Sequence, residues 1–266
     1  MSAHDIDYRI IGDDMQCIEI ELDPQEAIIA EAGSLMMKDT DIKMQTIFGD
    51  GSGQDTGVFG KIFSAGKRLL TGESLFLTAY THEGQGKKHA TFAAPYPGKI
   101  VPFDLTEYQG KIICQKDAFL CAAKGVAVGI EFQKKLGAGF FGGEGFIMQK
   151  LEGDGFAFIH AGGTIVERTL QVGEKLQVDT GCLVALTKDV DYDIEFVGGI
   201  RNTFFGGEGV FFASLQGPGK VWIQSLPFSR LADRIIASAP RMGGNRKGEG
   251  SILGGLGDLL DGDNRF

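Results

Sequence analysis

The hexapeptide FFGGEG occurs twice in this chain, at residues 140–145 and again at 204–209. The two copies lie 64 residues apart, and residues 130–160 laid on 194–224 without gaps agree at 13 of 31 positions. Agreement on both sides of a short motif indicates a duplicated structural unit, because a single catalytic loop would not need matching flanks. We therefore expect the chain to build one module more than once.

A third and more diverged copy precedes these two. The segment RLLTGESLFL (68–77) matches GFFGGEGFIM (139–148), with two leucines in place of the two phenylalanines. The segments AEAGSLMM, CQKDAFLCA and VDTGCLVAL also agree, since each places an apolar pair directly after a polar turn. A glycine-rich, loop-like insertion at 47–66 lengthens the first copy. The sequence thus predicts three tandem units, at about residues 17–105, 106–170 and 171–226.

Each unit is expected to consist of β-strands. The short aromatic runs SLFLTAY, GFIMQKL and GVFFASL are each followed by a glycine-containing turn and a second apolar run. This order is typical of β-hairpins. Three units joined around a pseudo-threefold axis would hide their open sheet edges. The predicted fold class is all-β, with residues 1–226 as a single compact body.

The chain changes character after Pro227. Residues 227–240 carry apolar side chains at helical spacing, with Ser229 as the expected N-cap. Residues 241–266 are rich in glycine with scattered leucines, and we expect a flexible tail there. The tail leucines form a candidate docking element for a partner: Leu256, Leu259 and Leu260.

Composition excludes several classes of protein. A net charge of −9 argues against a general nucleic-acid binder, which normally presents a basic face. The longest nearly apolar stretch, at 118–130, has 13 residues and contains a lysine, whereas crossing a bilayer takes about 20 apolar residues. The start of the chain lacks the basic and apolar regions of a signal peptide. The four cysteines lie in or beside apolar runs and never as CxxC, which is typical of buried thiols in a cytoplasmic protein.

Taken together, these motifs resemble the altered-inheritance-of-mitochondria protein 24 family, also called domain of unknown function 124. The resemblance covers nearly the whole chain and is carried by AEAGSLMM, the GGEG and TGES turns, and the tail segment EGSILGGLGDLL. It implies a bacterial-type member whose all-β fold is similar to that of the tryptophan RNA-binding attenuation protein, a short double-stranded β-helix type present in internal duplicates. It also implies a homo-oligomer, and a trimer is a form consistent with the resemblance. Mitochondrial members of the family are linked to inner-membrane organisation, and the resemblance supplies no catalytic residues.

Two sets of repeated residues are candidates for a site. Three carboxylates at the same register could coordinate a cation or face a cavity, or each could cap its own turn; they are Glu73, Glu144 and Glu208. The repeated aromatic pairs either pack in the core or form an exposed apolar patch for a partner; they are Phe140, Phe141, Phe204 and Phe205.

The histidines give weaker signals. His82 and His89 flank a predicted turn, HEGQGKKH, and could approach each other across it. A zinc site would need two further ligands, so a solvated turn is expected. His160 aligns with Gln224 in the next unit, so the repeat does not require an imidazole at that place.

From these observations we expect a non-enzymatic, self-associating scaffold or binding protein that uses no cofactor. Its C-terminal segment is expected to engage a protein partner or the membrane periphery. The alternative is a small-molecule or metal-dependent activity in a cavity between units. The sequence identifies no catalytic or cofactor-binding residue, and it does not determine whether a metal binds.

Overall fold

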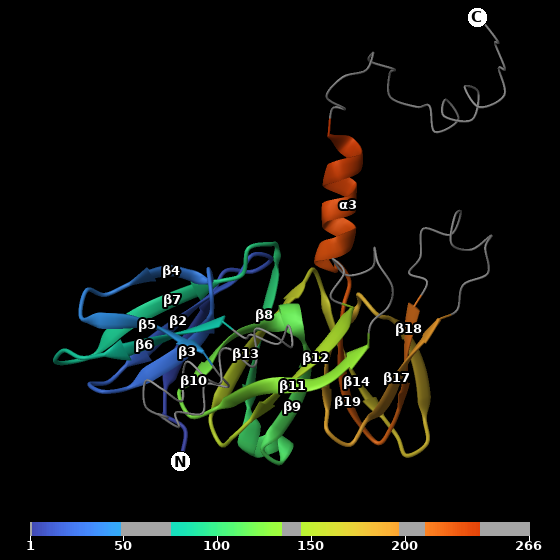
Figure 1. Cartoon of the computed structure of the whole chain (residues 1–266), viewed down its shortest axis with the longest axis horizontal. Coiled ribbons are helices and arrows are strands. Elements are labelled where there is room, and N and C mark those ends of the chain that lie inside the picture. The colour runs from blue at the N-terminus through green and yellow to red at the C-terminus, as the bar shows by residue number, and fades with distance from the viewer. Residues whose placement is uncertain (1, 49–75, 135–144, 197–210, 240–266) are drawn as a thin grey trace, which may run out of the picture. The chain divides into compact units, whose positions relative to one another are not determined.

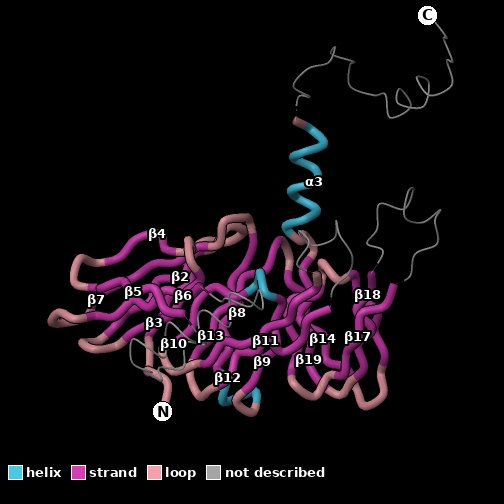
Figure 2. The backbone as a smooth tube through the Cα atoms, viewed as in Figure 1, coloured by secondary structure: helices cyan, strands magenta, loops and turns pink. Residues whose placement is uncertain are grey.

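The computed structural model describes residues 2–48, 76–134, 145–196 and 211–239 of the chain (Figure 1). The chain divides into two units, residues 1–231 and 232–266, and all the β-sheets lie in the first. The described residues are mostly strand, with two short 3₁₀ helices and one α-helix (Figure 2). The all-β fold class predicted from the sequence is confirmed.

The strands form four antiparallel sheets, described here in the order of their hydrogen-bonded neighbours. Sheet 1 contains β1 (Asp7–Ile11), β2 (Cys17–Leu22), β7 (Lys88–Ala93) and β4 (Leu35–Lys38). Sheet 2 contains β5 (Ile42–Phe48), β6 (Phe76–His82), β3 (Ala27–Glu31), β10 (Phe119–Ala123), β13 (Phe156–Gly162) and β8 (Gly98–Asp104). Sheet 3 contains β11 (Ala127–Lys134), β12 (Phe146–Glu152), β9 (Lys111–Gln115), β16 (Leu183–Thr187), β19 (Gly219–Gln224) and β14 (Ile165–Leu170). Sheet 4 contains β15 (Lys175–Asp179), β18 (Phe211–Gln216) and β17 (Asp191–Phe196).

The predicted strand runs are strands, but the predicted hairpins are wrong. Strand β6 pairs with β5 and β3, whereas β7, which follows it, pairs with β2 and β4. Strands β12 and β13, and likewise β18 and β19, are divided between two sheets in the same way. Turn residues determine where a chain reverses, but they do not determine which strand it then pairs with. A strand that is apolar on both faces can be buried in either of two packed sheets. The glycine turns therefore carry the chain from one sheet to another.

One register shift recurs at matching points of three strand pairs. It falls between Leu35 and Met37 where β4 meets β7, between Phe119 and Cys121 where β10 meets β13, and between Leu183 and Ala185 where β16 meets β19. The shift allows β4, β10 and β16 to be compared position by position. The homology of the three segments and a pseudo-threefold axis stay predictions.

Strands from distant parts of the chain lie side by side at two further places. Strand β10 pairs with β3 on its other side, and β16 pairs with β9 in the corresponding way. Among the described strands, by contrast, β4 pairs with β7 alone and β15 pairs with β18 alone. The β4 and β15 edges thus have no second neighbour in the described part of the chain.

Two interior strands lie in the core along almost their whole length. Strand β3 (AIIAE) and strand β10 (FLCAA) are buried on both faces, as expected for interior strands covered by two layers. The aromatic ring of Trp222 packs edge-on against Phe103 at 4.8 Å, and its indole N–H donates to Glu167 Oε2 at 3.1 Å. The large buried side chains lie in two apolar clusters, one mainly from sheets 1 and 2 and one mainly from sheets 3 and 4.

The N-terminal residues 2–6 pack against the later part of the chain. The His4 backbone N–H donates to Lys124 O at 2.9 Å, and the imidazole Nδ1 of His4 accepts from the Ala27 N–H at 2.9 Å. Gly125 has φ +113, and a Cβ there would lie 2.7 Å from Ala3 Cα. The close approach of this segment therefore requires a residue without a side chain at position 125.

Two 3₁₀ helices, η1 (Leu105–Tyr108) and η2 (Lys116–Ala118), connect strands, and α3 (Phe228–Ser238) follows the last sheet. The predicted N-cap, Ser229, is instead the second residue of α3, because the helix begins earlier than the apolar spacing suggested. In the described part of the chain we find no helix with the length and apolar character needed to cross a bilayer. The first two residues of the predicted insertion, Ile47 and Phe48, belong to β5.

Candidate functional site

The residues that the sequence singled out lie outside the described part of the chain. This holds for the three aligned carboxylates, the paired phenylalanines and the tail leucines: Glu73, Glu144, Glu208, Phe140, Phe141, Phe204, Phe205, Leu256, Leu259 and Leu260. Their proposed roles in cation binding and partner binding stay predictions. The candidate site must therefore be built from other residues.

The two turn histidines do not form a pair. His82 is fully buried; its Nδ1 accepts from the Gly84 N–H at 3.1 Å and its Nε2 contacts Gly86 O at 2.7 Å. The accepting Nδ1 places the proton on Nε2, which donates to the carbonyl oxygen. His89 instead contacts Glu21 Oε2 at 3.2 Å. The expectation of a solvated turn is wrong for His82, because the imidazole itself closes the turn.

Metal and thiol chemistry find little support among the described residues. No group of three or more histidine, cysteine or carboxylate side chains there is arranged to hold a metal ion. Cys114 and Cys121 are buried, and burial raises the pKa of the Cys114 thiol to about 12. A thiol with so high a pKa stays protonated and is a poor nucleophile at neutral pH.

His160 and Gln224 occupy matching places in β13 and β19, opposite Ile100 and Ile165 respectively. Gln224 Oε1 accepts from the Gly162 N–H at 2.7 Å, and its Nε2 donates to Gly181 O at 2.8 Å. Neither ring nitrogen of His160 has a hydrogen-bond partner in the described residues. Counting back three residues from the paired isoleucine leads to Gly162 in one case and to Pro97 in the other, and proline has no N–H to donate.

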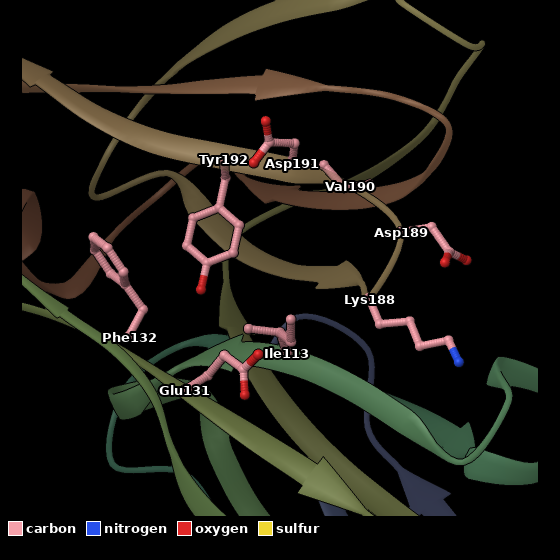
Figure 3. A pocket seen from close by; sticks show the side chains of 8 residues that line it. All are labelled: Ile113, Glu131, Phe132, Lys188, Asp189, Val190, Asp191 and Tyr192. Atoms are coloured by element: carbon pink, nitrogen blue, oxygen red, sulfur yellow. The ribbon is translucent and has the colours of Figure 1, made fainter.

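The structure contains an open pocket of about 380 Å³ between β11 and β17, here called the β11–β17 pocket (Figure 3). It is lined by Ile113 from β9, by Glu131 and Phe132 from β11, and by residues 188–192. The rings of Phe132 and Tyr192 meet edge to face, with centroids 5.4 Å apart and an interplanar angle of 71°. The pocket therefore joins two strands that belong to different sheets.

Glu131 is the best-defined polar group of the β11–β17 pocket. Both of its carboxylate oxygens accept hydrogen bonds from Lys111 Nζ, each at 2.9 Å. In Figure 3 the Tyr192 hydroxyl points toward this carboxylate. Burial, and secondly the charge of Glu131, raise the pKa of the Tyr192 phenol, so the hydroxyl keeps its proton at neutral pH.

A backbone irregularity accompanies Glu131. The pairing of β11 with β12 is shifted between Ile130 and Phe132, so Glu131 is the extra residue of a β-bulge. Strands β5 and β17, which pair with β6 and β18 in the corresponding way, keep a continuous register. Bulges re-aim the side chains near them and recur beside functional sites. Nothing in the sequence pattern predicted this pocket, because IEF reads alike at 130–132 and 194–196.

An ion pair also joins β11 to β17 further along both strands. Lys134 Nζ from β11 lies 2.9 Å from Asp193 Oδ1 and donates to Ile194 O at 2.6 Å on β17. Among the remaining lining residues, Lys188 is basic and two are acidic, Asp189 and Asp191. With Lys111 on Glu131, three carboxylates face two ammonium groups, and the remaining negative charge favours a cationic ligand over an anionic one.

The fold is all-β, with antiparallel sheets in which strands from distant parts of the chain pair, and a small pocket with polar and aromatic residues lies between two of these sheets. The family model of Mitochondrial biogenesis AIM24 matches residues 8–226, and the chain belongs to this family. The resemblance inferred from the sequence motifs is thereby confirmed.

Two streptococcal proteins are similar to this chain. It is 31% identical over 227 residues to Uncharacterized protein M6_Spy0233 of Streptococcus pyogenes serotype M6, an alignment that covers 84% of this chain and 86% of that protein. The crystal structure of protein SPYM3_0169 from Streptococcus pyogenes superposes with a TM-score of 0.69 and 22% identity. That match covers 88% of this chain and 100% of the other, and it supports the fold alone.

Proposed function

We propose that the protein is a non-enzymatic scaffold that assembles from copies of itself through the β4 and β15 edges. The proposal includes the three homologous units predicted from the sequence. In its terms, β10 completes the edge of β3, and β16 completes the edge of β9. Strand β15 is the next edge of the same kind, and β4 is the strand of the first unit that would complete such an edge.

The observation that carries this proposal is the exposure of three methionines. Met36 and Met37 on β4 are 60% and 52% exposed, although their counterparts on β10, Leu120 and Cys121, are buried. The counterparts on β16 are also buried: Val184 and Ala185. An apolar strand that is exposed where no described strand pairs with its second side is suited to a second copy of the chain.

The third methionine lies on β5. Met44 is 53% exposed and pairs with Tyr80, as Val128 pairs with Leu151 and Tyr192 pairs with Leu215. Val128 is buried, and Tyr192 packs on Phe132 of β11. Methionine side chains adapt to irregular contact surfaces, and fully burying one contributes about 1.5–3 kcal/mol. The proposal therefore assigns these three exposed methionines to the contact between copies.

Strand β15 supports the complementary half of the proposal. Val178 is its one buried residue and the others are exposed or half-buried, whereas β3 and β9 are buried along most of their length. A head-to-tail contact of β15 with β4 uses two different surfaces of the chain, so copies would form a closed ring or an open chain. A trimer is the closed form that the family resemblance predicts.

The assembly is tested by measuring molar mass in solution with light scattering during size-exclusion chromatography. For the native chain we expect a molar mass of two or more times 28.5 kDa. For Met37→Lys we expect monomers, because a charge at this position would be buried against β15. Val166→Lys is the matched control, since Val166 is an exposed apolar residue on β14. A native chain that is monomeric at all concentrations would refute the proposal.

The scaffold role also includes an attachment through the C-terminal segment. Helix α3 places Ile235 and Ile236 in solvent, with 61% and 71% of their surfaces exposed, and Leu231 lies one turn earlier. Apolar residues at this spacing form one side of an amphipathic helix, which can dock on a partner or at a membrane surface. A cytoplasmic location is part of this proposal and is supported by the buried thiols of Cys114 and Cys121.

A further inference from the structure

We propose that the β11–β17 pocket binds a small organic cation that carries a primary ammonium group. This goes beyond the scaffold role. It names a ligand class for the alternative that the sequence left open, a small-molecule or metal-dependent activity in a cavity between units. The pocket volume of about 380 Å³ lies in the range of small-molecule sites.

The polar end of the pocket is suited to an ammonium group. Lys111 occupies one lone pair on each oxygen of Glu131, and a carboxylate can accept about four hydrogen bonds in total. The Tyr192 hydroxyl, which points toward the same carboxylate, has lone pairs that can accept from a donor (Figure 3). An ammonium ion donates up to three hydrogen bonds and can satisfy both groups at once.

The apolar side of the pocket is suited to a short carbon chain. Ile113 and Val190 are buried residues of its wall, and Phe132 and Tyr192 add their ring surfaces. An aliphatic amine would therefore place its charge at Glu131 and its methylene groups against Ile113 and the two rings.

The β-bulge is evidence that this place in the fold differs from its counterparts. The same three residues, IEF, occur in β11 and β17, but only β11 carries the bulge at Glu131. Without the bulge, alternation along the strand would place Glu131 and Phe132 on opposite faces of the sheet. Both residues line the pocket, so the bulge is what brings the carboxylate and the ring to the same site.

Anions and metal ions fit this pocket less well. The lining carries more negative than positive charge, which disfavours an anion. A hard divalent cation needs several oxygen ligands arranged around one point, and no such group is present among the described residues. The aromatic pair would also be of no use to a small inorganic ion.

The experiment is a titration of the full chain with n-butylamine, followed by isothermal calorimetry and by the NMR signals of the tyrosine rings. Butyrate and n-butanol serve as anionic and neutral probes of the same size. We expect saturable binding of the amine with Kd of about 1 mM, since a ligand of few atoms rarely gains more than a few kcal/mol. Butyrate and n-butanol should not saturate over the same range.

Two variants assign the binding to this pocket. Glu131→Gln should weaken amine binding at least about tenfold, and Tyr192→Phe, which keeps the ring, should weaken it several-fold. Glu195→Gln removes an exposed carboxylate from β17 outside the pocket and should leave binding unchanged. Absence of saturable amine binding, equal binding of n-butanol, or an equal effect of Glu195→Gln would each overturn the proposal, whatever the oligomeric state of the chain.

Discussion

His160 in β13 and Gln224 in β19 hold matching places, yet among the described residues the amide of Gln224 has hydrogen-bond partners and the imidazole of His160 has none. His160 is 3% exposed and packs edge-on against Tyr96, with ring centroids 4.6 Å apart. An imidazole in such surroundings is tolerated while it is neutral, because a buried charge without a partner is costly. Gln224 therefore stabilises the fold through its hydrogen bonds, whereas His160 makes the stability of the fold depend on pH.

Protonation of His160 should destabilise the protein in mild acid. Burial lowers the pKa of His160 from 6.5 to about 4, so between these values the unfolded chain binds more protons than the folded one. Stability should fall as the pH drops from 6.5 toward 4, by at most about 3 kcal/mol from this group. Urea unfolding of the native chain and of His160→Gln at pH 7, 5.5 and 4 measures the difference. Parallel pH dependences of the two proteins would contradict this account.

Gly98 should not accept a side chain. A Cβ at this position would lie 2.1 Å from Ala161 O and 2.7 Å from His160 Nε2, so the backbone of β8 or β13 would have to move. We expect Gly98→Ala to lower the free energy of unfolding by about 1–3 kcal/mol. Gly129→Ala is the control, because its Cβ would meet only the flexible Lys150 side chain, at 3.2 Å. A thermal unfolding midpoint of Gly98→Ala equal to that of the control would contradict the prediction.

Peroxide should dissociate the assembly proposed here. Hydrogen peroxide transfers one oxygen atom to an exposed thioether and is itself reduced to water. The resulting sulfoxide is polar and is poorly suited to an apolar contact. In the proposed contact the residues concerned are Met36, Met37 and Met44; Met15 is also exposed but is not part of that contact. Replacement of all three by leucine should preserve the molar mass and remove its sensitivity to peroxide. If the leucine variant dissociates as readily as the oxidised native protein, the methionines are not the sensitive groups.

The exposed side of α3 should be needed for attachment to an apolar surface. We expect the full chain to float with vesicles of neutral phosphatidylcholine, and the double variant Ile235→Gln with Ile236→Gln to remain unbound. Ala237→Gln changes an exposed position of the same helix and serves as the control. A chain that ends after Pro240 separates the helix from the tail leucines: retained flotation assigns the attachment to α3. Flotation unaffected by the isoleucine substitutions would remove α3 from this role.

Sequence patterns predicted the strands but not their partners. The run FAFIHA became β13 because aromatic and branched residues flanked by glycine turns favour extended backbone. Its pairing with β8 and β10 could not be predicted, because a run that is apolar on both faces fits either layer. Pairing of β3 with β10 joins Ala30 to Cys121, and local patterns contain no information at that separation.

The candidate pocket was not predictable for a different reason. Repetition drew attention to residues that are alike in the units, such as Glu144 and Glu208. The β11–β17 pocket depends on a difference between the units, the bulge at Glu131. A bulge cannot be recognised from the sequence here, because the residues IEF occur at this place in both units. The aromatic residue Tyr192, which aligns with Val128, was the one available signal.

The pairing of Ala30 with Cys121 also bears on how the chain is made. A ribosome that has released only the first hundred residues presents β3 without β10, because β10 begins at Phe119. Until that strand emerges, an apolar edge is available to any neighbouring nascent chain, which is the condition under which β-rich proteins aggregate. Slower translation beyond this point would lengthen the vulnerable interval, and a chaperone that binds extended apolar segments would be needed most during it.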